Sequence, residues 1–326
     1  MKVLITTVPF AEHSELPLDT LRTNQIDYFI NPLGRRLTES ELAEMAVEYD
    51  VIIAGTEPIT TKVYRNAPNL KMISRVGIGV DSVDLNEARN RNIKVSYTPD
   101  APAPAVAELT LSHVMSLLRH THEANLLMHS GEWHRFAGRR LENVDIGIIG
   151  MGRIGTKVAN IFSLLGARKI HCNDINIDTL AALPDRCVVS DIATIQRECD
   201  VITLHTPLTP ATDNFVDQQF LSQLKPSSVI VNTARGQIVD EAALADALEN
   251  GRIAGAAIDV FSFEPYSGAL KNMSKCLLSA HMGSMSKDCR AQMEIEATRE
   301  AVNFILTGKQ ESPVPEQEYL LQKANL

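Results

Sequence analysis

Short runs of consecutive apolar residues recur along the chain, and the segments between them carry apolar residues at every third or fourth position. Continuous apolar runs are typical of parallel strands buried on both faces, and the intervening spacing is typical of helices. We therefore expect an α/β fold throughout. The predicted strands are Val3–Thr6, Tyr28–Ile30, Val51–Ala54, Met72–Arg75, Ile146–Ile149, Lys169–Cys172, Val201–Leu204, Val229–Val231, Ala256–Ile258 and Leu277–Ser279.

Punctuation residues mark the ends of several segments. Asp240 can cap a helix over 241–249, which Gly251 follows as a stop. The stretch 98–104 contains three prolines, so we expect an extended connection between domains there. A long helix is predicted after it from the stripe Ala107, Leu111, Val114 and Leu118, and its apolar extension through Trp133 suggests dimerisation.

The last helical pattern indicates how the domains are connected. The stripe Met293, Ala297, Ala301, Phe304 and Ile305 ends before Gly308 and lies beyond the last predicted strand, so this helix is free to pack on the first sheet. A chain of 326 residues also exceeds the usual size of one core. We expect a discontinuous first domain, residues 1–99 and 288–326, with a nucleotide-binding domain of residues 100–287 inserted into it.

Composition narrows the class of partner. The chain has 31 Lys and Arg against 40 Asp and Glu, a net charge of −9, which disfavours nucleic acid and anionic membranes as partners. No stretch approaches the ~18 apolar residues of a membrane span, and the first residues are too β-branched for a signal peptide. The five cysteines form no Cys-x-x-Cys pair and predict reduced, mostly buried thiols rather than disulfides or a metal site. We expect a cytoplasmic protein with a small-molecule partner and no metal.

A glycine motif lies between a strand-like run and a helix-like run. Gly150 permits a tight turn, Gly152 lets the backbone approach a pyrophosphate, and Gly155 lets the helix lie close to the sheet. Asp174 falls nineteen positions after Gly155, near the spacing of a carboxylate that binds the adenosine ribose. That carboxylate would repel a 2′-phosphate, so NAD is favoured over NADP. The alternative to a dinucleotide site is a glycine-rich turn without a ligand, and the alternative for Asp174 is a solvated aspartate in a turn.

Three titratable or charged residues follow strands of the same domain: Arg235, Glu264 and His281. Ligand sites in open α/β sheets lie beyond the carboxyl ends of strands. Oxidation of a 2-hydroxy acid needs a base for the hydroxyl proton, a cation for the carboxylate and a hydride acceptor. Histidine, with a carboxylate to hold its ring, and arginine suit the first two roles. Taken singly, each residue is as easily a surface or structural side chain.

The chain resembles the D-isomer-specific 2-hydroxyacid dehydrogenases, and among them the D-3-phosphoglycerate dehydrogenase-like branch. The resemblance covers about residues 45–305 and rests on seven motifs in family order. They are Arg75-Val-Gly-Ile-Gly-Val-Asp81, Val106-Ala-Glu108, Gly150–Gly155, His205-Thr-Pro-Leu-Thr209, Asn232-Thr-Ala-Arg-Gly236, Asp259-Val-Phe-Ser-Phe-Glu-Pro265 and His281-Met-Gly-Ser284.

The resemblance implies two doubly wound parallel-sheet domains, with a Rossmann NAD domain inserted into a flavodoxin-like substrate domain, and a homodimer. It implies that His281 is the acid/base, Glu264 its partner and Arg235 the substrate clamp. It implies that the loop of Val76, Gly77, Ile78 and Gly79 binds the substrate carboxylate. The implied cofactor contacts are Gly150, Gly152, Arg153, Ile154, Gly155, Asp174, Thr206, Pro207, Thr233, Ala234, Asp259, His281, Gly283 and Ser284.

The sequence departs from the family where the substrate is chosen. Residues 98–103 lack a glycine and an asparagine that members commonly have, and Gly55-Thr-Glu57-Pro58 stands where phosphoglycerate-specific relatives place an arginine. Glu57 would repel a phosphate if it faced the pocket. The expected activity is hydride transfer between NAD and a D-2-hydroxy acid, with 3-phosphoglycerate as one possible substrate. One alternative is a formate- or phosphite-type dehydrogenase, and Glu264 counts against the formate type. The other is a non-catalytic NAD(H)-sensing scaffold like the corepressors built on this fold.

Overall fold

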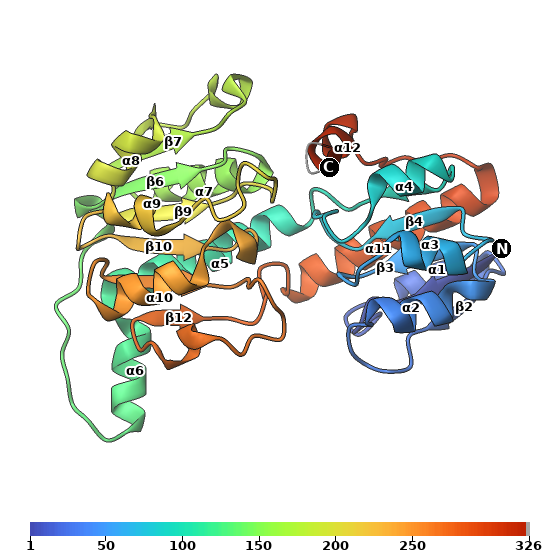
Figure 1. Ribbon diagram of the computed structural model, residues 1–326, viewed down its shortest axis with the longest axis horizontal. Helices are drawn as coiled ribbons and strands as arrows, with labels where there is room; N and C mark the ends of the chain where they lie inside the picture. Colours follow the sequence, from blue (N-terminus) through green and yellow to red (C-terminus); the bar gives the residue numbers. More distant parts are fainter. Residues whose placement is uncertain (324–326) are drawn as a thin grey trace. The chain divides into compact units, whose positions relative to one another are not determined.

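The computed structural model describes residues 1–323 and divides the chain into two compact units (Figure 1). Unit 1 consists of Met1–Pro102 and the chain from Ser284 onward, and unit 2 consists of Ala103–Gly283. The sequence pattern alone suggests boundaries at residues 99 and 288.

Unit 1 is built on a five-stranded parallel sheet of order β2-β1-β3-β4-β5, which is the flavodoxin-like order. The predicted α/β class and flavodoxin-like arrangement are confirmed. Its strands are β1 Lys2–Ile5, β2 Asp27–Ile30, β3 Val51–Ala54, β4 Met72–Arg75 and β5 Lys94–Ser96. Its helices are α1 Leu16–Thr23, α2 Glu39–Met45, α3 Thr61–Asn66, α4 Leu85–Asn90, α11 Lys287–Thr307 and α12 Glu316–Lys323.

Helix α11 belongs to unit 1 and lies on its sheet. This helix packs on β3, β4 and α1, and its Ala297 carbonyl accepts a hydrogen bond of 2.8 Å from the Ser74 hydroxyl of β4. The helix ends at Gly308, whose φ of 73° is the left-handed conformation that glycine adopts most readily. The predicted apolar stripe thus forms the buried face of α11.

Unit 2 is a seven-stranded parallel sheet of order β12-β11-β10-β9-β6-β7-β8, the arrangement of a Rossmann domain. Its buried apolar residues form two clusters. Its strands are β6 Asp145–Ile149, β7 Lys169–Asn173, β8 Cys187–Val189, β9 Val201–Leu204, β10 Val229–Asn232, β11 Gly255–Ile258 and β12 Cys276–Leu278. Its helices are α5 Pro102–Arg119, α6 Thr121–His129, α7 Arg153–Leu164, α8 Ile192–Glu198, α9 Gln218–Ser222 and α10 Glu241–Glu249, the last capped by Asp240 as predicted.

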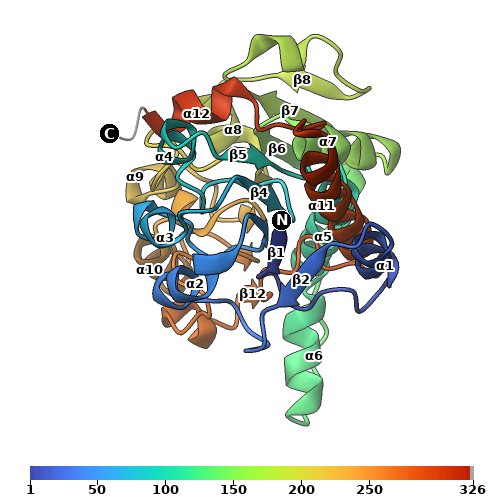
Figure 2. The same ribbon diagram turned by 90° about the vertical axis from the view of Figure 1, so that its right-hand side faces the viewer.

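Two expectations about residues 98–133 need correction. Residues 102–104 are not extended, because α5 begins at Pro102 and both later prolines fall in its first turn, where no backbone N–H partner is required. The apolar helix also does not run on through Trp133. It stops at His120, which has a φ of 54°, and α6 then ends at His129 (Figure 2).

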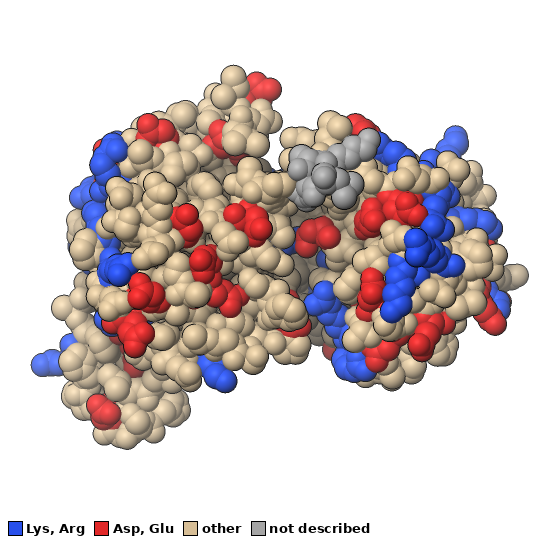
Figure 3. All heavy atoms as spheres, in the orientation of Figure 1, with Lys and Arg blue, Asp and Glu red and all other residues tan. Residues whose placement is uncertain are grey.

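Surface charge, the state of the cysteines and the length of the helices can be compared with the expectations from composition. Acidic and basic side chains are interspersed on the face shown in Figure 3. All five cysteines are free thiols, four of them buried, and burial raises the pKa of Cys199 and Cys276 to about 12. Within residues 1–323, no helix is long and apolar enough to cross a membrane.

Candidate active site

The glycine motif forms the turn between β6 and α7. Gly150 has a φ of 97°, and a Cβ there would lie 2.6 Å from the His205 carbonyl. A Cβ on Gly155 would lie 1.9 Å from the Gly150 oxygen, so α7 can approach the turn this closely only because residue 155 is glycine. Gly152, the N-cap of α7, has nothing within 4 Å of its Cβ position. The turn is therefore closed on one side and open at Gly152.

Asp174 follows β7 directly and reaches the same turn. Its Oδ2 accepts a hydrogen bond of 2.6 Å from the Met151 N–H, and its Oδ1 accepts one of 2.8 Å from the Asn176 N–H. The predicted ribose ligand is thus also a support of the glycine turn. The distance in sequence between Asp174 and the glycine motif does not predict this second role.

The site fits a dinucleotide by its own chemistry. Arg153 and Ile154 begin the twelve-residue α7, whose first N–H groups favour an anion. The switch point of this sheet lies between the adjacent strands β6 and β9, and Thr206 follows β9. Its buried hydroxyl has no hydrogen-bond partner. Next to it, Pro207 accepts a hydrogen bond of 2.7 Å from Thr212 through its carbonyl. An open glycine, a helix N-terminus and an unpaired hydroxyl at one switch point suit a pyrophosphate.

The two predicted acid/base partners are in contact. Nδ1 of His281 lies 2.8 Å from Oε2 of Glu264 and 3.0 Å from its Oε1. Glu264 is fixed in turn by the Phe261 N–H, 3.1 Å from Oε1. Because Nδ1 is engaged by the carboxylate, Nε2 is the ring nitrogen left to exchange a proton.

Asp259 organises the loop that carries His281. Its Oδ1 accepts hydrogen bonds from the Ser279 hydroxyl at 2.6 Å and the Met282 N–H at 2.8 Å. Its Oδ2 accepts one from the Gly283 N–H at 2.9 Å, and its carbonyl accepts one from the His281 N–H at 2.7 Å. His281 itself has a φ of 51°, a conformation that costs a non-glycine residue about 1–3 kcal/mol. The buried aspartate therefore holds the loop in a strained shape.

Arg235 follows β10, next to the strands that precede Glu264 and His281 in the sheet order. Its backbone carbonyl accepts a hydrogen bond of 2.8 Å from the Asn232 amide, whose oxygen accepts one from the Ala234 N–H at 3.0 Å. Thr233 shares a hydrogen bond of 3.0 Å with Thr110 of α5. The three predicted catalytic residues thus lie after adjacent strands, at one edge of unit 2.

The predicted substrate loop lies in unit 1, after β4. Gly77 has a φ of 138°, and its N–H donates to the Thr98 hydroxyl at 2.7 Å. Ile78 packs against the apolar core of the unit. One of the N–H groups expected to face substrate is therefore already engaged. Ser284 also belongs to unit 1, and the other predicted cofactor residues belong to unit 2.

Glu57 lies at the switch point of the unit 1 sheet, where β1 and β3 are adjacent. It is 1% exposed, and its carboxylate accepts hydrogen bonds from the Thr6 hydroxyl and, at 2.9 Å, from the Gly55 N–H. These two hydrogen bonds and its burial hold the Glu57 carboxyl group in place.

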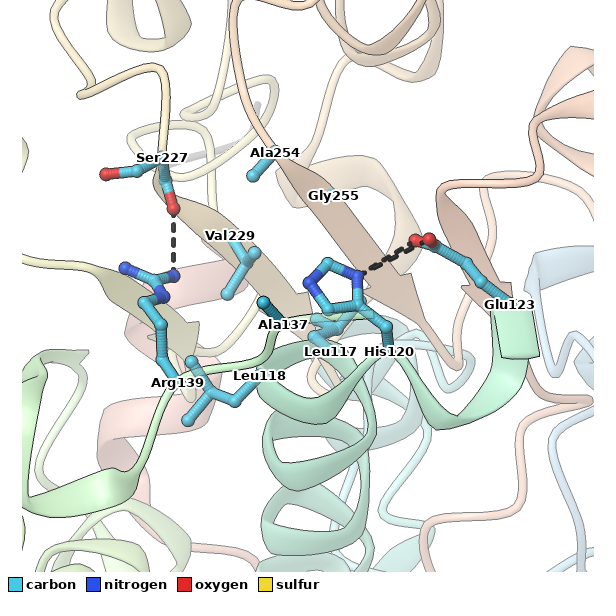
Figure 4. Close-up of a pocket in the computed structure, with 10 residues that line it drawn as sticks. All are labelled: Leu117, Leu118, His120, Glu123, Ala137, Arg139, Ser227, Val229, Ala254 and Gly255. Atoms are coloured by element: carbon cyan, nitrogen blue, oxygen red, sulfur yellow. Dashed lines mark hydrogen bonds and ion pairs between the residues drawn. The ribbon is translucent and has the colours of Figure 1, made fainter. Parts of the chain in front are cut away.

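A hollow of about 180 Å³ opens at the other end of the unit 2 sheet (Figure 4). Val229 and Gly255, the first residues of β10 and β11, line it, together with His120, Glu123 and Arg139. Arg139 donates to the Ser227 carbonyl at 2.9 Å, and His120 faces Glu123. This hollow lies at the amino ends of strands whose carboxyl ends lead to the predicted catalytic residues. It is not part of that site.

Comparison with known proteins identifies the family. Residues 111–283 match the model of the D-isomer specific 2-hydroxyacid dehydrogenase NAD-binding domain. The chain is 32% identical to a hydroxypyruvate reductase of Thermotoga maritima, over 81% of this chain and 87% of that protein. It belongs to the D-isomer specific 2-hydroxyacid dehydrogenase family. The predicted family, Rossmann NAD domain and NAD cofactor are confirmed.

Further relatives define the neighbourhood within this dehydrogenase family. A D-3-phosphoglycerate dehydrogenase of Synechocystis sp. is 33% identical over 83% of this chain and 50% of that protein. The solved structure of the TT0316 protein from Thermus thermophilus has a TM-score of 0.85 and 31% identity, and the match covers 97% of this chain and 100% of that one. The chain spans about half the length of the D-3-phosphoglycerate dehydrogenases that it matches.

Proposed function

We propose that the protein catalyses reversible hydride transfer between NAD and a D-2-hydroxy acid. The observation that carries the proposal is the His281–Glu264 pair at 2.8 Å, on a strained loop at the carboxyl edge of the NAD-binding sheet. NAD, when bound, accepts the hydride from C2 of the hydroxy acid, and the product is the 2-oxo acid. The hydroxyl proton goes to Nε2 of His281.

The other polar groups of the site have complementary tasks. Glu264 holds the ring of His281 and stabilises the imidazolium that proton transfer creates. The guanidinium of Arg235 binds the substrate carboxylate through two N–H groups. The loop Val76–Gly79 is assigned to substrate binding through those of its backbone N–H groups that Thr98 does not engage. In the reverse direction, His281 returns the proton to the carbonyl oxygen.

The cofactor roles are assigned by position. Arg153 and Ile154, with Gly150, Gly152 and Gly155, face the pyrophosphate at the start of α7. Asp174 binds the adenosine ribose. The remaining dinucleotide contacts are assigned to Thr206, Pro207, Thr233, Ala234, Asp259, Gly283 and Ser284.

Glu57 bears on the substrate. Glu57 is buried at the switch point of the substrate-domain sheet, and its carboxylate would repel a phosphate bound close to that point. We therefore expect an unphosphorylated D-2-hydroxy acid to be preferred over 3-phosphoglycerate. Several relatives are named hydroxypyruvate reductase or glyoxylate reductase, so their substrates belong in the test.

The test is NADH formation or consumption with a panel of D- and L-2-hydroxy acids and 2-oxo acids, phosphorylated and plain, with formate and phosphite included. The expected result is turnover with a D-hydroxy acid and none with its L-isomer. A His281→Ala variant should lose turnover while its affinity for NADH stays within about twofold, and Arg235→Ala should chiefly raise KM for the acid. Tight NADH binding without turnover of any compound would favour the NAD(H)-sensing scaffold.

We also propose that the protein is a cytoplasmic homodimer formed through residues 121–140. None of the residues of α6 is buried, and Leu126, Met128 and Trp133 are 55%, 53% and 79% exposed. Clustered exposed apolar side chains mark interaction surfaces, and free thiols suit a reducing compartment. Sedimentation should give a dimer at micromolar concentration, and Leu126→Glu with Met128→Glu should give a monomer. A wild-type monomer would contradict this assembly.

A further inference from the structure

The catalytic loop is bonded to a histidine that the reaction does not use. His113 of α5 is 4% exposed, and its Nε2 lies 3.0 Å from the Ser279 hydroxyl. Ser279 in turn donates to Asp259 at 2.6 Å, and Asp259 accepts the N–H groups of Met282 and Gly283. A continuous line of hydrogen bonds therefore runs from α5 to the two residues that follow His281.

The direction of each hydrogen bond follows from the available protons. Ser279 has one hydroxyl proton, and the ionised Asp259 can only accept, so the 2.6 Å bond uses that proton. The Ser279 oxygen then accepts the Nε2–H of His113. Burial lowers the pKa of His113, so near neutral pH the ring is uncharged and its Nε2–H tautomer is the one that fits.

The helix face that carries His113 contacts both catalytic loops. Val106, Thr110 and His113 are spaced at i, i+4 and i+7 and share one side of α5. Val106 lies 3.2 Å from the Cβ position of Gly283, and Thr110 shares a hydrogen bond with Thr233, two residues before Arg235. The other buried face of α5, with Val114 and Leu118, is fixed in the core of unit 2. The helix is thus a rigid support for these loops.

We propose that His113 is a positioning residue, which acts through Ser279 and Asp259 to hold the strained loop with His281 aligned for proton transfer. The positive φ of His281 needs support from its surroundings, and the His113–Ser279 bond locks the serine rotamer that supplies part of it. The assignment rests on the proposed function for its catalytic consequence, whereas the anchoring of the loop is a property of the chain itself.

The experiment compares His113→Leu, His113→Gln and Ser279→Ala with the wild type. Losing the bond from α5 should lower the single-turnover rate of NADH formation about three- to tenfold. KM for NAD should change less than about twofold, because the glycine turn and Asp174 are untouched. His113→Gln, whose amide can still donate to Ser279, should recover most of the rate.

A double-mutant cycle tests the route of the effect. If His113 acts through Ser279, then His113→Leu adds little to Ser279→Ala, whereas multiplied losses would overturn the proposal. The matched control is His171→Leu, because His171 is also buried and bonds a serine hydroxyl, Ser190, at 2.9 Å on the far side of the sheet. This control should lower stability without slowing NADH formation.

A second readout needs no turnover. The Met282 and Gly283 amides should exchange their hydrogens faster in His113→Leu than in wild type or His171→Leu. Faster exchange with a slowed single turnover supports the proposal. Unchanged exchange and an unchanged rate refute it. If the wild type turns over no hydroxy acid, the proposed function fails, and the exchange result alone still decides whether His113 anchors the loop.

Discussion

Two aspartates beside the candidate site support the backbone around them. Asp174 closes the glycine turn by accepting the Met151 N–H, and it is also the residue proposed to bind the ribose. Asp259 is buried and accepts the Ser279 hydroxyl and the Met282 and Gly283 N–H groups, so it supports the loop as well as being a proposed cofactor contact. Substituting either residue will therefore change geometry as well as affinity.

Asp174→Ala should weaken NAD binding about tenfold to a hundredfold, because a charged hydrogen bond to the ribose and the support of the turn are lost together. NADH fluorescence titration measures the change. Asp178→Ala is the control, because this aspartate is exposed and lies only four residues further along the chain. Equal affinities for the two variants would remove Asp174 from the cofactor site.

At the scale of elements, the turn between β6 and α7 separates two uses of glycine. A methyl group on Gly155 would clash with the Gly150 carbonyl oxygen. A methyl group on Gly152, whose φ is −69°, would contact no other atom. Packing therefore requires a glycine at position 155 but not at position 152. At Gly152 the proposed pyrophosphate contact is what would require the absence of a Cβ.

Gly155→Ala should lower the midpoint of urea unfolding and NAD affinity together, since α7 must move away from the turn. Gly152→Ala should unfold at the wild-type urea concentration but bind NAD at least about tenfold more weakly, because its methyl group occupies the pyrophosphate's approach. Denaturation curves and NADH titrations on the two variants distinguish the roles. Wild-type affinity in Gly152→Ala would show that the cofactor does not pass over this residue.

The sequence predicts these elements where burial leaves a strong signal. Fully buried strands such as β3 and β9 are continuous apolar runs and are located within a residue. β5 is missed because Val95 is its only apolar residue, and β8 is missed because it is a short strand at the sheet edge with Val188 and Val189 exposed. The start of α5 is misplaced because prolines at a helix start and in an extended linker look alike in sequence.

At the scale of the whole molecule, the order of the motifs along the chain predicts the candidate site. The hydrogen bonds that hold its loops in place cannot be predicted from that order. Arg235, Glu264 and His281 can be predicted because each follows a strand in a known order. The link from His113 to Ser279 joins residues 166 positions apart and depends on how α5 lies on the sheet. Two polar residues, Thr110 and His113, on the buried side of an apolar helix are the signal that sequence reasoning did not use.

Buried histidines also make the stability of unit 2 depend on pH. Burial lowers the pKa of His113 and His171, and it lowers that of His205 to about 3, from an ordinary value of 6.5. These rings are neutral in the folded protein, but the unfolded chain takes up protons below pH 6.5. Stability is therefore complete above that pH and falls as the pH drops toward the folded-state pKa values. The loss from His205 alone should approach roughly 1 kcal/mol per pH unit once the pH is well below 6.5.

Unit 1 should respond in the opposite direction, because burial raises the pKa of Glu294 and Glu300, and their protonation on acidification relieves a destabilising charge. Amide exchange at pH 7 and pH 5, corrected for the intrinsic rates, should show protection falling in residues 103–283 but not in unit 1. A His205→Gln variant should reduce the pH dependence in unit 2, because its amide does not titrate. An undiminished slope in that variant, or equal losses in the two units, would mean that the buried histidines do not control acid stability.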